Sequence, residues 1–156
     1  MLASVQSTYS DILTSVFSTP IAAKAWLATF AGVLGLVQVS TGARIFGKLE
    51  HLVPIGRPYV NRVHRWSGRL AILFTLPVAF HCIFILGFQT TDARVLAHSL
   101  VGSFVYGVIA VKIFFVRDRA HPRWTLPLIG GSLFTVLAAL WGTSALWYFT
   151  NVRFGF

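Results

Sequence analysis

Residues 70–88 read LAILFTLPVAFHCIFILGF, a run without a single charged side chain. A helix needs about 20 mostly apolar residues to cross a hydrocarbon layer roughly 30 Å thick. Hydrophobic residues make up 56% of the 156-residue chain and charged residues only 11%. A soluble domain of this size could not bury such an apolar excess. The run therefore predicts a membrane-spanning helix, and the composition predicts that it has companions.

Three further stretches have the length and composition of a span. We therefore expect four spans, at residues 24–47, 64–88, 93–116 and 124–150. The links between them are too short to form a soluble domain. The predicted fold class is all-α, an integral membrane four-helix bundle built from residues 20–156.

Residues 1–19 precede this bundle and are predicted to form a helix of their own. Apolar residues recur there at helical spacing with Ser, Thr and Asp between them, which is typical of an amphipathic helix in the membrane interface. The apolar positions are Leu2, Val5, Tyr9, Ile12, Leu13, Val16 and Phe17. A disordered tail is the alternative. Thr19 and Pro20 then predict a new helix start, with Thr19 as the cap.

Most cations fall at one end of the predicted bundle. They are Arg44, Lys48, Arg57, Arg62, Arg65, Arg69, Lys112, Arg117, Arg119 and Arg123, whereas the other end has Lys24, Arg94 and Arg153. The positive-inside rule makes the first end cytoplasmic, so we expect both termini outside. The formal net charge of +9 then reflects topology, and it favours anionic lipid or an acidic protein as a partner over nucleic acid.

Two histidines lie in the apolar part of predicted spans, where an ionisable side chain is a candidate for function. The short link at 89–92 makes the second and third spans antiparallel neighbours, and at 1.5 Å per residue His81 and His98 both come to ~6–10 Å below one surface. Two imidazoles at one depth can supply both axial ligands of a haem iron. We therefore predict that His81 and His98 ligate one haem b. Gly102, one turn below His98, would leave room for the porphyrin ring.

The alternative for each histidine is structural, because polar residues in membranes often hydrogen-bond a neighbouring helix. His64 opens the second predicted span at the cytoplasmic end, ~25 Å from His81 along the helix, and cannot share its haem. It could bind a second haem with His121 or His51, exchange a proton with a quinone, or contact lipid phosphate. These alternatives stay open.

The sequence shows no other recognisable chemistry. It contains no phosphate loop, paired carboxylates, Ser-His-Asp set or zinc spacing, and it has only four acidic residues. The single cysteine, Cys82, cannot form a disulfide within the chain. These absences argue against a self-contained hydrolase, so the chain is at most the electron-transfer subunit of an oxidoreductase.

Three segments carry a resemblance to known families: HRWSGRLA at 64–71, LPVAFHC at 76–82 and AHSLVG at 97–102. Over roughly residues 24–150 the chain resembles small actinobacterial-type four-helix membrane proteins of uncharacterised function, which implies a bacterial plasma membrane. More loosely, it resembles b-type cytochromes of the ascorbate-reducible and ferric-reductase kind. That resemblance implies haem held by histidine pairs, which carries over to His81, His98 and His64. The chain departs from a two-haem pattern because its first and fourth spans lack histidine.

The first functional hypothesis is a cytochrome b-like electron-transfer subunit that binds one haem between the second and third spans near the outer face. It would pass electrons between a quinol pool or partner subunit and an outside acceptor, with a membrane or periplasmic redox protein or a larger complex as its partner. The second is a cofactor-free anchor or accessory subunit of a respiratory or photosynthetic complex. The third is pigment or quinone binding by the same histidines.

Overall fold

The computed structural model describes residues 2–49, 55–118 and 120–152. Throughout these ranges the regular structure is helical and includes no strand. Four helices are long and apolar enough to cross a membrane: Pro20–Ile45, Arg57–Leu86, Ala93–Arg117 and Thr125–Asn151. The prediction of an all-helical chain with four such helices is confirmed.

Two of the long helices contain a π-helical segment, in which the turn is wider than in an α-helix. The elements in chain order are α1 (Leu2–Thr14), α2 (Pro20–Ile45), α3 (Arg57–Phe80), η1 (His81–Leu86), α4 (Ala93–Arg117), α5 (Thr125–Trp141), η2 (Gly142–Leu146) and α6 (Trp147–Asn151). The second long helix is therefore α3 continued by η1. The fourth is α5 continued by η2 and α6.

α2 begins where the sequence predicted a new helix, whereas α3 begins earlier than predicted. α2 begins at Pro20, where the Thr19 Oγ1 accepts a hydrogen bond from the Ala22 N–H at 3.1 Å, which confirms the predicted cap. α3 begins at Arg57, seven residues before the predicted start, because the arginines along its first half interrupt the apolar pattern without breaking the helix. His64 consequently lies two turns inside α3 and not at its beginning.

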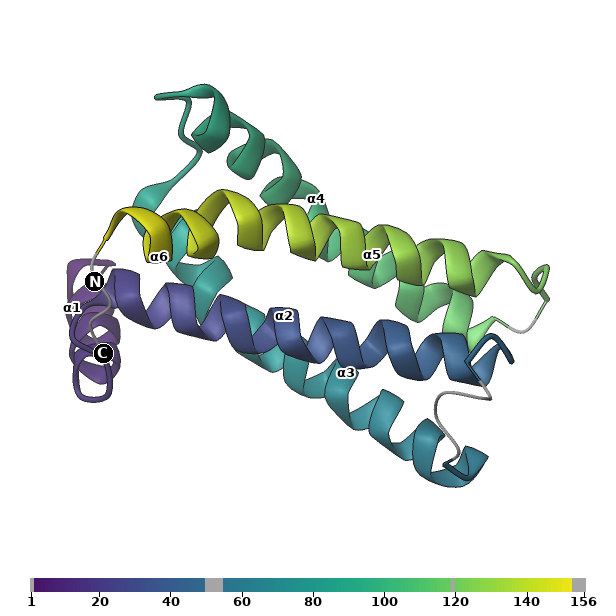
Figure 1. The fold of residues 1–156 in the computed structure, drawn as a ribbon. Coiled ribbons are helices and arrows are strands. Elements are labelled where there is room, and N and C mark those ends of the chain that lie inside the picture. Colours follow the sequence, from purple (N-terminus) through teal and green to yellow (C-terminus); the bar gives the residue numbers. More distant parts are fainter. Residues whose placement is uncertain (1, 50–54, 119, 153–156) are drawn as a thin grey trace.

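Each long helix packs against at least one other long helix. α2 lies against both α3 and α5, and α4 lies against α5 (Figure 1). The close packing expected between the second and third long helices is not observed. In the described part of the chain, α3 and α4 make few close backbone approaches, although a short link joins η1 to α4.

Glycine positions explain these pairings, since small residues let helices in a membrane approach closely. A Cβ added to Gly68 of α3 would lie 3.2 Å from the Gln38 side chain of α2. A Cβ added to Gly102 of α4 would lie 3.6 Å from Leu140 of α5. Gly107 of α4 faces open space. The close-approach glycines of α3 and α4 therefore point to other helices, and not to each other.

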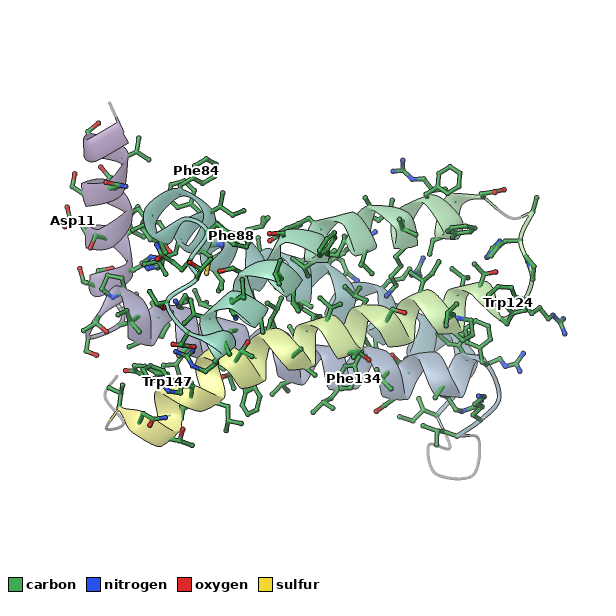
Figure 2. All side chains as sticks on the ribbon, turned by 90° about the horizontal axis from the view of Figure 1, so that it is seen from above. Asp11, Phe84, Phe88, Trp124, Phe134 and Trp147 are labelled. Carbon is green, nitrogen blue, oxygen red and sulfur yellow. The ribbon has the colours of Figure 1, made fainter. Side chains whose placement is uncertain are left out.

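α1 lies across one end of the bundle, and α6 ends beside it (Figure 1). We call this the α1 end. Figure 2 shows Asp11 and Trp147 at the α1 end and Trp124 at the opposite end. The described chain therefore enters and leaves the bundle at the same end, as four spans require. Which side of a membrane the α1 end faces stays a prediction.

Large apolar side chains cover the outside of the long helices. Leu73, Phe84, Phe104 and Leu128 each expose more than half of their surface, from 57% for Leu73 to 67% for Phe104. Apolar surface of this extent needs an apolar solvent around it. The exterior therefore indicates contact with a lipid bilayer.

Candidate functional site

His81 occupies the first position of η1, at the α1 end. Only 5% of its surface is exposed, and its buried Nδ1 has no hydrogen-bond partner among the described residues. The Tyr9 ring of α1 packs against it with 5.9 Å between ring centroids. Pro77 lies one turn earlier and has no N–H to donate, which weakens the regular helical ladder before the π-helical segment begins. Short π-helical segments are frequent at functional sites.

His98 lies in α4 and faces the fourth long helix. Its Nδ1 is 2.9 Å from the Thr143 Oγ1 of η2. The Thr143 hydroxyl also lies 2.7 Å from the Ala139 carbonyl. When it donates its hydrogen to that carbonyl, its oxygen accepts from the imidazole, and Nδ1 then carries the proton while Nε2 carries the lone pair. A histidine that binds a metal is commonly oriented by such a bond from its other nitrogen.

Two cations accompany these histidines. Lys24, the fifth residue of α2, is close enough to His81 and His98 to act on both electrostatically. The Arg94 Nη1 donates to the Thr143 carbonyl at 2.7 Å, and its guanidinium lies 4.4 Å from the centre of the Trp147 ring. Arg94 thereby holds the start of α4 against η2. We call Lys24, His81, Arg94, His98 and Thr143 the His81 cluster.

The predicted site residues His81, His98 and Gly102 have different surroundings in the structure. His81 and His98 both lie at the α1 end, but no hydrogen bond or ring contact joins them in the described chain. Gly102 faces Leu140 at ordinary contact distance, so the space it leaves is used by the packing of α4 on α5. Gly102 therefore has a structural role that its sequence context did not show.

A second polar cluster lies toward the other end and links three helices. The Gln38 Nε2 of α2 donates to the His64 carbonyl and, at 2.8 Å, to the Ser67 Oγ of α3. Its Oε1 accepts from the Lys112 Nζ of α4 at 3.4 Å. We call Gln38, Thr41, His64, Ser67 and Lys112 the Gln38 cluster.

His64 repeats the geometry of His98. Its Nδ1 is 2.8 Å from the Thr41 Oγ1, and that hydroxyl donates to the Val37 carbonyl at 2.6 Å. With that donation, Nε2 again carries the lone pair. In the described ranges no second histidine bonds or stacks on His64. The Nδ1 of His121 is buried and unpartnered within these ranges, but its ring packs on Phe115, and His51 lies outside the described residues.

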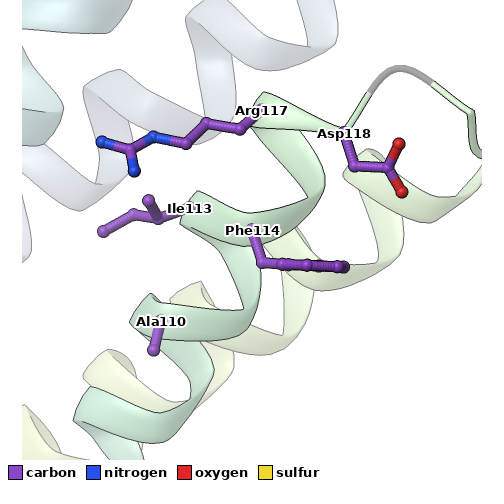
Figure 3. Close-up of a pocket in the computed structure, with 5 residues that line it drawn as sticks. All are labelled: Ala110, Ile113, Phe114, Arg117 and Asp118. Atoms are coloured by element: carbon purple, nitrogen blue, oxygen red, sulfur yellow. The ribbon is translucent and has the colours of Figure 1, made fainter.

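A hollow on the outer face of α4 offers no comparable chemistry. It measures about 540 Å³ and is lined by Ala110, Ile113, Phe114, Arg117 and Asp118. Figure 3 shows the side chains of Arg117 and Asp118 pointing away from each other. Without convergent polar groups, this hollow has no feature of a ligand site.

The sequence did not predict that Thr143 and Lys24 belong to the His81 cluster. Thr143 is an unremarkable threonine until the fold brings it to His98, 45 residues away. The sequence places Lys24 among the few cations of the less basic end, but only the fold brings its charge near His81 and His98.

Four long apolar helices with polar clusters between them define a multi-pass helical membrane protein. In the described part of the chain, no group of three or more His, Cys, Asp or Glu side chains could hold a metal ion. The chain belongs to DUF6529, a family of unknown function whose model matches residues 3–156. No curated protein and no solved structure matches it. The predicted resemblance to an uncharacterised family agrees with this, whereas that to b-type cytochromes stays a prediction.

Proposed function

We propose that the protein is a cytochrome b-like electron-transfer subunit that holds one haem b at the His81 cluster, with His81 and His98 as axial ligands. The observation that carries the proposal is the Nδ1 of His81, a ring nitrogen in a 5%-exposed residue that has no hydrogen-bond partner in the described part of the chain. Buried polar groups are almost always paired, so an orphan calls for a ligand, an ion or a water.

The rest of the cluster fits a haem. Thr143 orients His98 so that Nε2 carries the lone pair, and Lys24 and Arg94 supply positive charge for the two propionates. Because α3 packs on α2 and α4 packs on α5, a flat group between α3 and α4 would disrupt neither helix pair. Haem supplies a one-electron couple, and two axial imidazoles leave its iron no open position for oxygen chemistry.

The proposal includes a membrane placement. The basic end of the bundle would face the cytoplasm, which puts the α1 end and both termini outside a bacterial plasma membrane. The four long helices would form the transmembrane bundle, and α1 would lie in the outer interface. The electron acceptor would then be a membrane or periplasmic redox protein or a larger complex at that side.

The visible spectrum of the detergent-solubilised protein, oxidised in air and then reduced with dithionite, tests the proposal. We expect a Soret band with sharp α and β bands on reduction. His81→Ala and His98→Ala should each abolish the low-spin spectrum as fully as the double variant does, because members of one site are not additive. His64→Ala should leave the spectrum unchanged. Retention of full low-spin haem by both single variants at the His81 cluster would overturn the assignment.

One observation favours a second candidate, a cofactor-free anchor or accessory subunit. The hydrogen bond between His98 and Thr143 is also what a purely structural histidine makes in a membrane helix. A folded but colourless preparation from haem-sufficient cells would support this candidate and exclude the cytochrome.

A further inference from the structure

A groove runs between α1 and the second long helix at the α1 end. Its volume is about 830 Å³, and Tyr106 of α4 closes one side. The lining is mostly apolar, is contributed by α1, α3 and η1, and includes no charged residue. A site of this size and composition suits a lipophilic small molecule, and the absence of charge makes a neutral ligand the better match.

Of the four hydroxyl groups in this lining, those of Thr8, Tyr9 and Tyr106 donate their hydrogens to other atoms of the protein. Thr8 donates to the Ser4 carbonyl at 2.9 Å and Tyr9 donates to the Pro77 carbonyl at 2.9 Å. Tyr106 donates to the Thr75 Oγ1 at 3.2 Å. A hydroxyl that donates its one hydrogen still has lone pairs to accept with. The groove therefore presents hydrogen-bond acceptors to its ligand.

Tyr9 keeps this role over a wide pH range. Burial, together with the neighbouring Cys82 thiol, raises the pKa of its hydroxyl above the ordinary value. The Tyr9 hydroxyl thus stays protonated and bonded to Pro77 at physiological pH, with its oxygen available as an acceptor.

An acceptor-lined, neutral groove discriminates among membrane molecules. An acyl chain would leave the hydroxyl oxygens unpaired, and a phospholipid headgroup would bring charges that nothing in the lining compensates. An oxidised quinone also fits poorly, because its oxygens only accept. A hydroquinone matches, because its two hydroxyl groups donate and its ring and tail are apolar.

We propose that the groove binds a lipophilic hydroquinone of the membrane, in preference to the oxidised quinone. The position agrees with such a ligand. The Tyr9 ring lines the groove and lies 5.0 Å from the Phe80 ring and 5.9 Å from the His81 ring, centroid to centroid. A ligand in the groove would therefore sit one side-chain layer from His81. Resting on the proposed function, a hydroquinone bound here would be oxidised to the quinone, giving its two electrons one at a time to the His81 cluster and its two protons to the water at the α1 end.

Binding is measured under anaerobic conditions with the full chain in lipid nanodiscs, using a short-tailed naphthoquinol and the corresponding naphthoquinone as probes. We expect the wild type to bind the quinol at least tenfold more tightly than the quinone. Tyr106→Phe and Thr8→Val should each weaken quinol binding about fivefold, the worth of one hydrogen bond, and leave quinone binding unchanged. Equal affinity for both probes, or no response to either variant, would overturn the proposal.

Two alanine-to-phenylalanine variants test whether the ligand binds in the groove. Ala79→Phe places a ring in the groove and should abolish binding of both probes. Ala138→Phe adds the same ring at an exposed position of α5 and should change nothing. If Ala79→Phe does not fold, the two hydroxyl variants still decide. Native mass spectrometry that finds the groove filled by phospholipid, undisplaced by the quinol, also counts against the proposal.

The outcomes for groove and haem are separable. The double variant His81→Ala with His98→Ala should lose haem and still bind quinol, because neither histidine lines the groove. Haem without quinol preference refutes the groove alone. Quinol preference in a protein that never binds haem refutes the proposed function alone.

Discussion

The replacement of Thr143 by valine tests whether His98 is a ligand or a structural histidine. Valine keeps the shape of threonine and removes the oxygen that lies 2.9 Å from the His98 Nδ1. The loss of that hydrogen bond should lower folding stability by about 1 kcal/mol. If Nε2 binds a haem iron, the loss of the orienting bond should also weaken haem binding by roughly 10–100-fold.

The chain supplies a matched control at the Gln38 cluster. Thr41→Val removes the corresponding oxygen from His64, at 2.8 Å. Both threonine hydroxyls donate to the carbonyl four residues earlier, at 2.6 Å for Thr41 and 2.7 Å for Thr143. The two variants should therefore lose similar folding stability. Only Thr143→Val should lose haem affinity.

The assay is a titration of haem into haem-free protein, followed at the Soret band, with thermal unfolding of each variant measured in parallel. Equal haem affinity for Thr143→Val and the wild type, at an intact fold, would refute the orienting role of Thr143. Weaker binding by Thr41→Val alone would move the cofactor to the Gln38 cluster.

Three further predictions concern packing, charge and topology. Gly68→Ala should destabilise the fold by about 1 kcal/mol, because its Cβ would lie 3.2 Å from the Gln38 amide and displace a hydrogen-bonded side chain. Gly107→Ala meets no atom within 4 Å and should instead stabilise by about 0.5–1 kcal/mol through helix propensity; thermal or denaturant unfolding compares the two. Lys112→Met should raise the unfolding temperature, since it removes a cation held inside a span by one long hydrogen bond of 3.4 Å. A lower unfolding temperature would show instead that the fold needs the charge of Lys112. Single cysteines in the link between α2 and α3 should be shielded from impermeant reagents in intact cells, whereas those beyond α6 should react; the reverse pattern would invert the proposed orientation.

The number of long helices followed from the sequence because each span is a long apolar run. The start of α3 could not be predicted from the sequence. The arginines in its first half lower the mean hydropathy, so this part of the helix resembles a polar link between spans. A π-helical segment forms where backbone N–H groups bond to the carbonyl five residues earlier and not to the one four residues earlier, and the two choices differ little in energy. No composition rule could place η1 at His81 or η2 at Thr143.

Helix pairing was the largest error in the predicted arrangement. The short link 89–92 requires α3 and α4 to meet near one end, but it does not require their lengths to pack. Close packing follows the small residues, and Gly68 and Gly102 face α2 and α5. The depth argument for His81 and His98 does not depend on this pairing, because it uses only the distance of each residue from the link, and it stays a prediction. The sequence could not predict which side chains contact the two imidazoles, Thr143 for His98 and Tyr9 for His81.

The repeated pairing of histidine and threonine does not imply two cofactor sites. His98 and His64 each pair with a threonine, and the Nδ1 of His121 is unpartnered like that of His81 among the described residues, but His121 packs on Phe115 and the proposal places a haem only at the α1 end. A single haem at one end of a bilayer roughly 30 Å thick cannot carry electrons to the other side. Under the proposed function, donor and acceptor must therefore both engage the α1 end, the donor from within the membrane beside α1 and the acceptor from the adjoining water. Electron transfer by this chain would then run along one face of the membrane, and crossing it would require another subunit.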